Sequence, residues 1–181
     1  MAEITPATAY SSGTSHLRPA GGHRGGRGRK ISDYGKQLAE KQKARREYGL
    51  RETQFRRYFG QAAKSTIATG QALLTALELR LDTIVYRGGI AKTRAMARQF
   101  VNHRHVCVNG HIINAPGYTV KVGDMVGLKN HMLFEYNKEV IIPNWLSYSP
   151  KSHTVTVERM PKAEDLVSDI NSQLIIEFYS R

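Results

Sequence analysis

The sequence predicts an α+β protein in which basic helical segments come first and short strands follow. Apolar residues recur at helical spacing in several segments between residues 32 and 102. After residue 105 the pattern changes to short alternating segments, separated by Asn-Gly and Gly-Asp pairs that are typical of tight turns between strands. Lysine and arginine cluster in the helical part, so we expect its helices to present positive charge to a polyanion.

Positive charge is concentrated in the first 109 residues of this 181-residue chain, whose net charge is +12. Residues 1–60 contain 13 Lys and Arg against 5 Asp and Glu, and residues 61–109 contain 7 against 2. Residues 110–181 contain 7 against 8 and are close to neutral. Such a chain attracts phosphate backbones or anionic membranes. No run approaches the roughly 20 apolar residues of a membrane span, so we exclude a membrane-spanning protein.

Residues 1–30 are expected to form a flexible basic extension. Within it, residues 21–30 read GGHRGGRGRK, which combines pliable glycines with guanidinium groups suited to phosphate. Such segments usually become ordered only when a nucleic acid binds, and the alternative is a solvated tail. The candidate RNA-binding residues of this segment are Arg24, Arg27, Arg29 and Lys30.

Two basic helices are predicted next. The first runs from Ser32 to Glu47, with Ser32 or Asp33 as its cap and Gly49 just beyond its end. The second lies within residues 50–64, where phenylalanines alternate with arginines. We expect these phenylalanines, Phe55 and Phe59, to be core residues, and the alternative is stacking on RNA bases. The candidate RNA-binding residues of the two helices are Lys36, Lys43, Arg45, Arg46, Arg51, Arg56 and Arg57.

A longer apolar helix is predicted over Gln71–Arg87, because leucines and Ile84 fall on one face of a helical wheel. Gly88-Gly89 should end it. Arg80 and Arg87 share another flank of this helix and are candidate RNA-binding residues.

The following helix should begin at Thr93, where Lys92, Thr93 and Arg94 add positive charge to a helix N-terminus that already favours phosphate. We expect that no neighbouring carboxylate neutralises Arg94 or Arg98, which favours RNA contact over a solvated cationic face. The candidate RNA-binding residues here are Lys92, Thr93, Arg94, Arg98, and, at the exit of the helix, His103, Arg104 and His105.

Several short strands are predicted in the remainder of the chain. Residues 106–113 should form a hairpin around Asn109-Gly110, with further strands at residues 118–120 and 125–128 joined at Gly123-Asp124. An alternating strand, HTVTVER, an acidic turn, PKAEDLVSDI, and a final apolar strand, LIIEFYSR, complete the chain.

The sequence offers no supported active site, metal site or cofactor site. It contains neither a phosphate-binding loop nor a dinucleotide fingerprint after a strand. Cys107 is the single cysteine, which excludes a disulfide framework and a cysteine-based zinc site and fits a reducing compartment. The histidines His103, His105 and His111 are spaced as strand and turn residues rather than as ligands. We therefore expect no enzyme activity and no cofactor.

Three long blocks in the same order resemble the bacterial-type small-subunit ribosomal protein S4 family: SDYGKQLAEKQKARREYGLRETQFRRYF, ALELRLDTIVYRGGIAKTRAMARQFVNHRHVCVNG and DLVSDINSQLIIEFYSR. The likeness covers roughly Gly22 to Arg181. The middle block alone would indicate only an RNA-binding module shared with several RNA-modifying enzymes and tRNA synthetases. The chain departs from the family in its short start without cysteines, in the short segment after the module, and at Gly88, where an apolar residue is usual.

The resemblance implies a fold of two parts, a helical domain completed by the C-terminal tail and a mixed domain that carries a two-helix and short-strand RNA-binding module. The expected divisions are the flexible extension 1–30, the helical domain 31–79 with 162–181, the module 80–141, and a strand with its connection, 142–161.

The resemblance also implies a function. It is that of a structural protein of the small ribosomal subunit, which binds the 5′ domain of the small-subunit rRNA, nucleates assembly and contributes to translational accuracy. The implied neighbours are ribosomal protein S5 and mRNA where it enters the subunit, and the expected location is the cytoplasm, with an organellar ribosome as the alternative. Two other functions stay open: a free RNA-binding regulator and an RNA-modifying enzyme.

Overall fold

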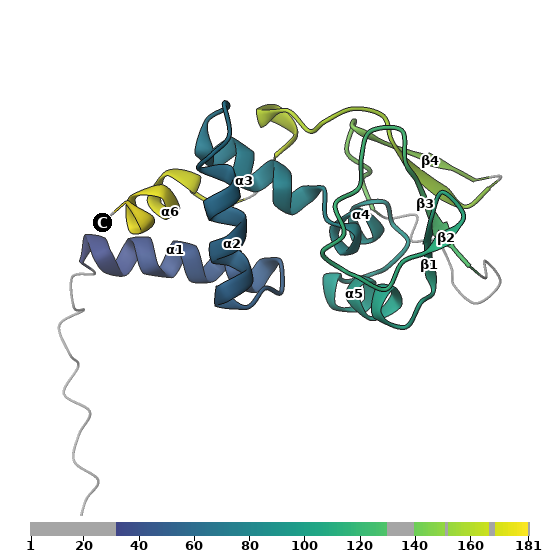
Figure 1. Cartoon of the computed structure of the whole chain (residues 1–181), viewed down its shortest axis with the longest axis horizontal. Helices are drawn as coiled ribbons and strands as arrows, with labels where there is room; N and C mark the ends of the chain where they lie inside the picture. The colour runs from purple at the N-terminus through teal and green to yellow at the C-terminus, as the bar shows by residue number, and fades with distance from the viewer. Residues whose placement is uncertain (1–31, 130–139, 151, 167–168, 181) are drawn as a thin grey trace, which may run out of the picture. The chain divides into compact units, whose positions relative to one another are not determined.

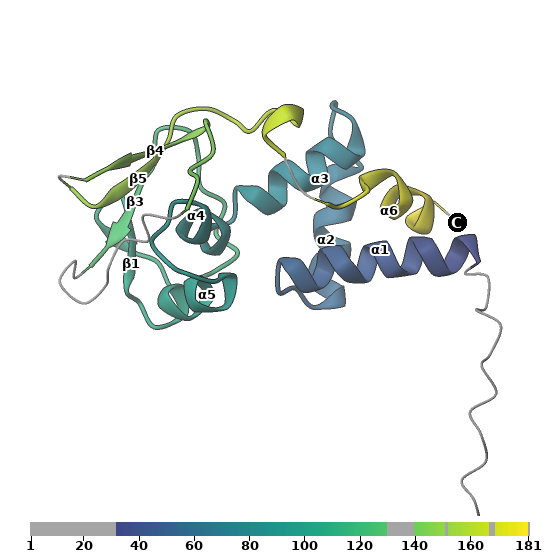
Figure 2. The ribbon, with the colours of Figure 1, turned by 180° about the vertical axis from the view of Figure 1, so that it is seen from behind.

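The computed structural model describes residues 32–129, 140–150, 152–166 and 169–180, and these residues form a helical half and a mixed half (Figures 1 and 2). The helical half consists of α1 (Asp33–Glu47), α2 (Glu52–Ala62), α3 (Thr69–Glu78) and α6 (Ser172–Tyr179). The mixed half consists of α4 (Leu81–Arg87), α5 (Arg94–Asn102), β1 (Val106–Val108), β2 (His111–Ile112), β3 (Met125–Leu128), β4 (Leu146–Ser149) and β5 (Thr154–Val157). This composition confirms the predicted α+β class. The predicted basic extension, with Arg24, Arg27, Arg29 and Lys30, lies outside the described residues.

Helix α1 begins and ends where its local sequence predicts. The Ser32 hydroxyl oxygen accepts a hydrogen bond from the Gly35 N–H at 3.2 Å, which caps the first turn. At the other end Gly49 takes a left-handed φ of +59°, and the N–H groups of Gly49 and Leu50 bond back to the carbonyls of Arg46 and Arg45. This termination directs the chain from α1 into α2.

The structure has a helix, α6, where a final strand was predicted, so that prediction is wrong. Asn171 caps it by accepting hydrogen bonds from the N–H groups of Gln173 and Leu174. Its apolar side chains recur at helical spacing, and Ile175 is fully buried in one cluster with Phe55 and Leu77. The apolar run LIIEFY fits a strand and a buried helix equally well, and the face offered by α1 and α3 selects the helix.

The predicted helix over Gln71–Arg87 is broken into α3 and α4. Arg80 has an extended backbone, with a ψ of 142°, and precedes the first residue of α4. The chain at Leu79 and Leu81 bonds instead to residues 118–120: the Leu81 N–H donates to the Tyr118 carbonyl, and the Val120 N–H donates to the Leu79 carbonyl, both at 2.9 Å. The predicted strand at 118–120 is correspondingly wrong, because this segment makes only an isolated bridge between Thr119 and Arg80.

The mixed half is built on one antiparallel sheet of strand order β2-β1-β3-β5-β4. The predicted hairpin around Asn109-Gly110 is confirmed, since both residues have positive φ, at 50° and 83°. Strands β3 and β5 also lie where alternation predicts them, whereas β4 was not expected. Because β5 pairs with both β3 and β4, the strands β4 and β5 extend the sheet of the module.

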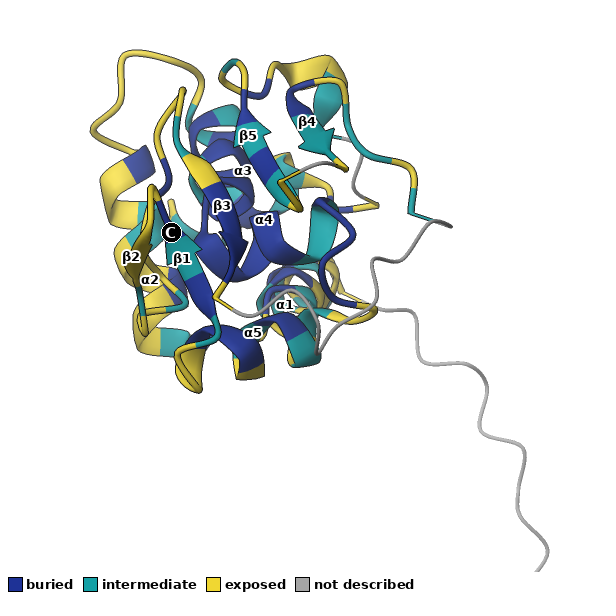
Figure 3. Ribbon diagram, turned by 90° about the vertical axis from the view of Figure 1, so that its right-hand side faces the viewer, coloured by how far each residue is buried: buried dark blue, intermediate teal, exposed yellow. Residues whose placement is uncertain are grey.

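One face of the sheet packs on α4 and α5, which lie behind the strands in Figure 3. Val106, Val126, Val155 and Ile84 are fully buried in this core. The packing also accounts for Gly88, because a Cβ at this position would lie 2.5 Å from a methyl of Val155 and 2.9 Å from the Ile84 carbonyl oxygen. The core thereby fixes the position of α5 relative to the sheet.

Candidate nucleic-acid interface

Arg80, a predicted RNA-binding residue, is buried, with 3% of its surface exposed. Its guanidinium donates to both carboxylate oxygens of Asp82, at 3.0 and 2.7 Å, and to the Tyr58 hydroxyl at 2.8 Å. Burial by itself would lower the pKa of Arg80, but its hydrogen bonds to Asp82 and that residue's charge outweigh this and raise it. Arg80 is therefore engaged within the protein, where it joins Asp82 and Tyr58 at the turn between α3 and α4, and an RNA contact at this residue stays a prediction.

A second buried carboxylate, Glu78, accepts hydrogen bonds from side chains of both halves. It accepts hydrogen bonds from the Tyr48 hydroxyl at 2.8 Å and from two guanidinium nitrogens of Arg87 at 2.9 and 3.1 Å. Burial, followed by the charge of Glu78, raises the pKa of Tyr48 well above its ordinary value. Arg87, another predicted contact residue, is thus held by an interior carboxylate.

Arg94 on α5 lies at the same junction. Its guanidinium lies over the rings of Tyr48 and Tyr86, at 4.5 and 4.9 Å from their centroids. It is also 3.5 Å from a carboxylate oxygen of Glu47 and 3.7 Å from one of Glu78. The expectation that no carboxylate neutralises Arg94 is wrong, because both acids come from the helical half and not from neighbouring positions in the sequence.

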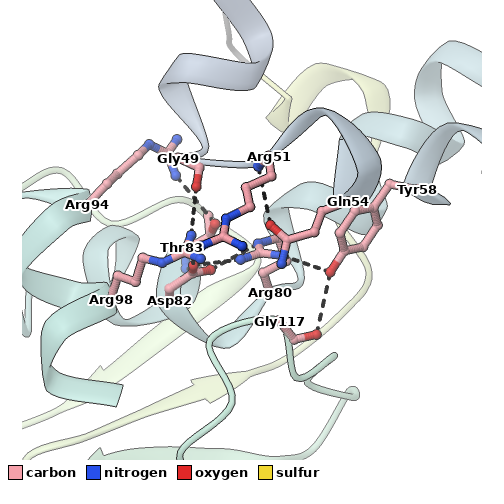
Figure 4. A network of polar contacts seen from close by, with 10 residues as sticks. All are labelled: Gly49, Arg51, Gln54, Tyr58, Arg80, Asp82, Thr83, Arg94, Arg98 and Gly117. Carbon is pink, nitrogen blue, oxygen red and sulfur yellow. Dashed lines mark hydrogen bonds and ion pairs between the residues drawn. The ribbon is translucent and has the colours of Figure 1, made fainter. Parts of the chain in front are cut away.

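Arg98, one turn further along α5, has a looser set of partners (Figure 4). It donates to the Gly49 carbonyl at 2.7 Å and lies 3.9 Å from a carboxylate oxygen of Asp82. Its side chain keeps 33% of its surface exposed. The expected absence of a carboxylate is wrong here too, although this ion pair is long and Arg98 retains a face toward solvent.

Other predicted residues on α1 have partners within the helical half. Lys36 pairs with Asp33 at 3.0 Å on the exposed surface, and Lys43 donates to the backbone carbonyl of Asp169. Arg45 is half-buried, whereas Arg46 is exposed. Only Arg46 therefore keeps a fully available guanidinium in the last turn of α1.

Most of the predicted cations on α2 and around α5 face solvent. In the part of the chain that the structure describes, the side chains of Arg46, Arg56, Arg57, Lys92 and Arg104 are exposed and have no hydrogen bond or ion pair. Arg51, at the start of α2, is also exposed. Exposed lysines that the sequence analysis did not single out are Lys64, Lys121, Lys129 and Lys162.

The two ends of α5 are built by local signals. The Thr93 hydroxyl oxygen accepts from the Met96 N–H at 3.1 Å, so the predicted cap is confirmed. At the exit, Arg104 takes a left-handed φ of 62°, and the N–H groups of Arg104 and His105 bond back to the carbonyls of Val101 and Phe100. The rings of His103 and His105 are nearly parallel, with an interplanar angle of 5°. This turn directs Arg104 away from the core.

The described residues contain no group of three or more histidine, cysteine, aspartate or glutamate side chains placed to hold a metal ion. In the same part of the chain, no helix is both long and apolar enough to cross a membrane.

Two family models match adjacent parts of the chain. Residues 16–78 match the Ribosomal protein S4/S9 N-terminal domain, and residues 79–126 match the S4 domain. The two matches meet at the break between α3 and α4. The boundary between the two matched domain families therefore coincides with the break between the two helices.

Full-length relatives are also similar. Small ribosomal subunit protein uS4 of Chloroflexus aurantiacus is 47% identical over 165 residues, covering 86% of this chain and 80% of the relative. The uS4 protein of Opitutus terrae is 46% identical over 171 residues, covering 90% and 84%, and that of Chromobacterium violaceum is 43% identical over 173 residues, covering 91% and 84%. At this identity and coverage, the chain belongs to the uS4 family of small ribosomal subunit proteins.

Proposed function

We propose that this protein is a structural constituent of the small ribosomal subunit that binds small-subunit rRNA. Membership of the uS4 family and the presence of an S4 domain support this proposal. The observation that carries it is the set of exposed arginines on α2 and at the end of α1, which have no carboxylate partner among the described residues. Phosphate is the ligand for which such guanidinium groups are suited.

The proposed contact surface has three parts. The first consists of the exposed arginines at the end of α1 and at the start and along α2: Arg46, Arg51, Arg56 and Arg57. The second is the two ends of α5, with Lys92 and Thr93 at its start and Arg104 with the two flanking histidines at its exit. The third is the N-terminal Gly/Arg segment with Arg24, Arg27, Arg29 and Lys30. Arg87 and Arg94 pair with acids of the helical half, and Arg80 donates to the Tyr58 hydroxyl of α2, so these three arginines join the two halves.

The family likeness supports finer assignments as part of the same proposal. The protein binds the 5′ domain of the rRNA early, nucleates subunit assembly and contributes to accuracy near the side where mRNA enters. Ribosomal protein S5 is its proposed protein neighbour, and its role is structural rather than catalytic. Its location is the ribosome of the bacterial cytoplasm.

Two measurements test the proposal. The purified full chain should bind small-subunit rRNA with an affinity that falls steeply with salt, because phosphate contacts release counterions. It should also co-sediment with small subunits in a one-to-one ratio after a high-salt wash. Complete absence from washed subunits, together with salt-insensitive or undetectable rRNA binding, would refute the proposal.

A further inference from the structure

Two hollows flank Arg98 at the junction of the helical and mixed halves. The first hollow has a volume of about 200 Å³ and is lined by residues that include Arg46, Thr83, Arg94 and Arg98. The second has a volume of about 140 Å³ and is lined by residues that include Arg57, Tyr58, Gly117 and Arg98. Arg98 lines both hollows, so both adjoin the same side chain.

Both hollows are lined by more cations than acids. The first has three arginines, Arg46, Arg94 and Arg98, and two acids, Glu47 and Asp82. Those acids are already engaged by arginines, at 3.5 Å for Glu47 and 2.7 Å for Asp82. The second hollow has three arginines, and none of its described lining residues is acidic. Arg94 and Arg80 are themselves paired with acids, so the uncompensated positive charge that an anion meets is that of Arg46 in the first hollow and Arg57 in the second, beside the weakly paired Arg98.

Each hollow contains one arginine that is free to bind a ligand. Arg46 in the first hollow and Arg57 in the second are exposed, and neither side chain has a hydrogen bond or ion pair within the described part of the chain. Neither side chain would therefore have to give up a hydrogen bond or ion pair in order to bind a ligand. A guanidinium presents paired donors that match the geometry of a phosphate.

Arg98 differs from the other arginines of the junction in how weakly it is held by acids. Its distance to Asp82 is 3.9 Å, whereas Arg80 approaches the same carboxylate to 2.7 Å. With a third of its side chain exposed, Arg98 can turn donors toward an anion in either hollow while its bond to the Gly49 carbonyl stays in place.

We infer that the two hollows bind neighbouring phosphates of one RNA strand, which crosses the junction of the two halves over Arg98. This inference rests on the proposed rRNA-binding function and specifies where the strand lies. In this arrangement Arg46 and Arg57 each bind one phosphate, and Arg98 lies between the two. A strand held in this way would contact α1, α2 and α5 at once and would bridge the two halves.

The test is the salt dependence of rRNA binding by the full chain carrying Arg46→Ala, Arg57→Ala or both. Each lost phosphate contact should reduce the slope of log affinity against log salt by about 0.7 to 0.9, and the double variant should lose about twice that amount. Lys162→Ala is the control, because Lys162 is an exposed cation that lines neither hollow. Thermal unfolding should be unchanged in all variants, since neither arginine has a partner to lose.

The outcomes separate this inference from the proposed function. If the unchanged protein binds rRNA with a steep salt slope and neither arginine substitution alters it, the two-hollow site is refuted and the proposed function stands. If the unchanged protein does not bind rRNA, both are refuted.

Ethylation of individual rRNA phosphates tests whether a single strand is involved. Ethylation should block binding of the unchanged protein at two neighbouring phosphates. That block should disappear at one of them for Arg46→Ala and at the other for Arg57→Ala. If the two affected positions lie on different strands, the inference of one crossing strand is overturned.

Discussion

The arginines of α5 and those of α2 belong to the same residue type but have opposite environments. Arg94 on α5 is stacked on two tyrosines and paired with two acids of the helical half. Arg56 and Arg57 on α2 face solvent and have no ion pair within the described residues. The arginines of this protein therefore occur in two environments: some join the two halves, and others are exposed and belong to the surface that we propose for rRNA binding.

The difference arises from where the carboxylates lie. Glu47, Glu78 and Asp82 are buried or half-buried at the junction, and each is within ion-pair distance of an arginine of the mixed half. Helix α2 has one acid, Glu52, which is engaged by Lys41 at 2.7 Å and forms no ion pair with Arg56 or Arg57.

The largest expected effect is on stability, for Asp82→Ala. Both Asp82 and Arg80 are almost fully buried, so removing the acid leaves an uncompensated interior charge. Loss of one partner of such a pair costs about 3–5 kcal/mol of unfolding free energy, measured by urea denaturation of the full chain. Asp33→Ala, which removes an exposed ion pair, is the control and should change stability by less than about 0.5 kcal/mol. A loss below about 1 kcal/mol for Asp82→Ala would show that the buried pair does not hold the junction.

Arg94→Ala should also lower stability, by about 1–3 kcal/mol, because the substitution removes the stacking on Tyr48 and Tyr86 and leaves Glu47 without its partner. The slope of rRNA affinity against salt should stay unchanged. Unfolding and binding are measured on the same preparation. A reduced salt slope with intact stability would place Arg94 on the RNA surface instead.

Arg98→Ala should reduce both the salt dependence of rRNA binding and the stability of the fold, because Arg98 is partly exposed and only weakly paired with Asp82. We expect the salt slope to fall by about 0.7 to 0.9, as for one lost phosphate contact. The stability loss should be smaller than for Arg94→Ala, because the ion pair with Asp82 is long and partly solvated. An effect on stability as large as that of Arg94→Ala would mean that Arg98 only joins the two halves and does not contact RNA.

The smallest expected effect is a pH dependence at Glu52. Burial raises the pKa of this carboxyl, but hydrogen bonds from Lys41 and Tyr179 lower it more, so its pKa in the folded protein lies below the ordinary value. A lowered folded pKa contributes stability that is present above the unfolded value, near 4.5, and is lost as the pH falls through the folded value. Urea midpoints of Glu52→Gln should therefore lie below those of the unchanged chain at pH 7 and approach them below pH 4.5. A constant gap down to pH 3 would contradict the shift.

Local signals in the sequence predicted the elements whose ends are set by neighbouring residues. Ser32 and Gly49 delimit α1, Thr93 begins α5, and Asn109-Gly110 turns the hairpin, each through backbone bonds to residues within a few positions. The arginines of α2 could also be separated from its core residue by local pattern, because the period of an α-helix places Arg56 and Arg57 on other faces than the buried Phe55.

The elements that sequence reasoning missed depend on contacts between distant residues. The apolar run of α6 was assigned to a strand because nothing nearby shows that α1 and α3 offer it a helical groove. The break at Arg80 depends on Asp82, Tyr58 and the segment at 118–120, which no helical period reveals.

The family, both ends of α1, the start of α5, the hairpin and the excess of positive charge could be predicted from the sequence alone, because each is encoded in residue order over short distances or in long matching blocks. Only the tertiary structure decided which arginines are available. A charge is neutralised by whatever carboxylate lies within a few ångströms, and Glu47 and Arg94 meet at 3.5 Å although 47 positions separate them in the chain. Spatial proximity of this kind depends on how the two halves pack, which no segment of the sequence states alone.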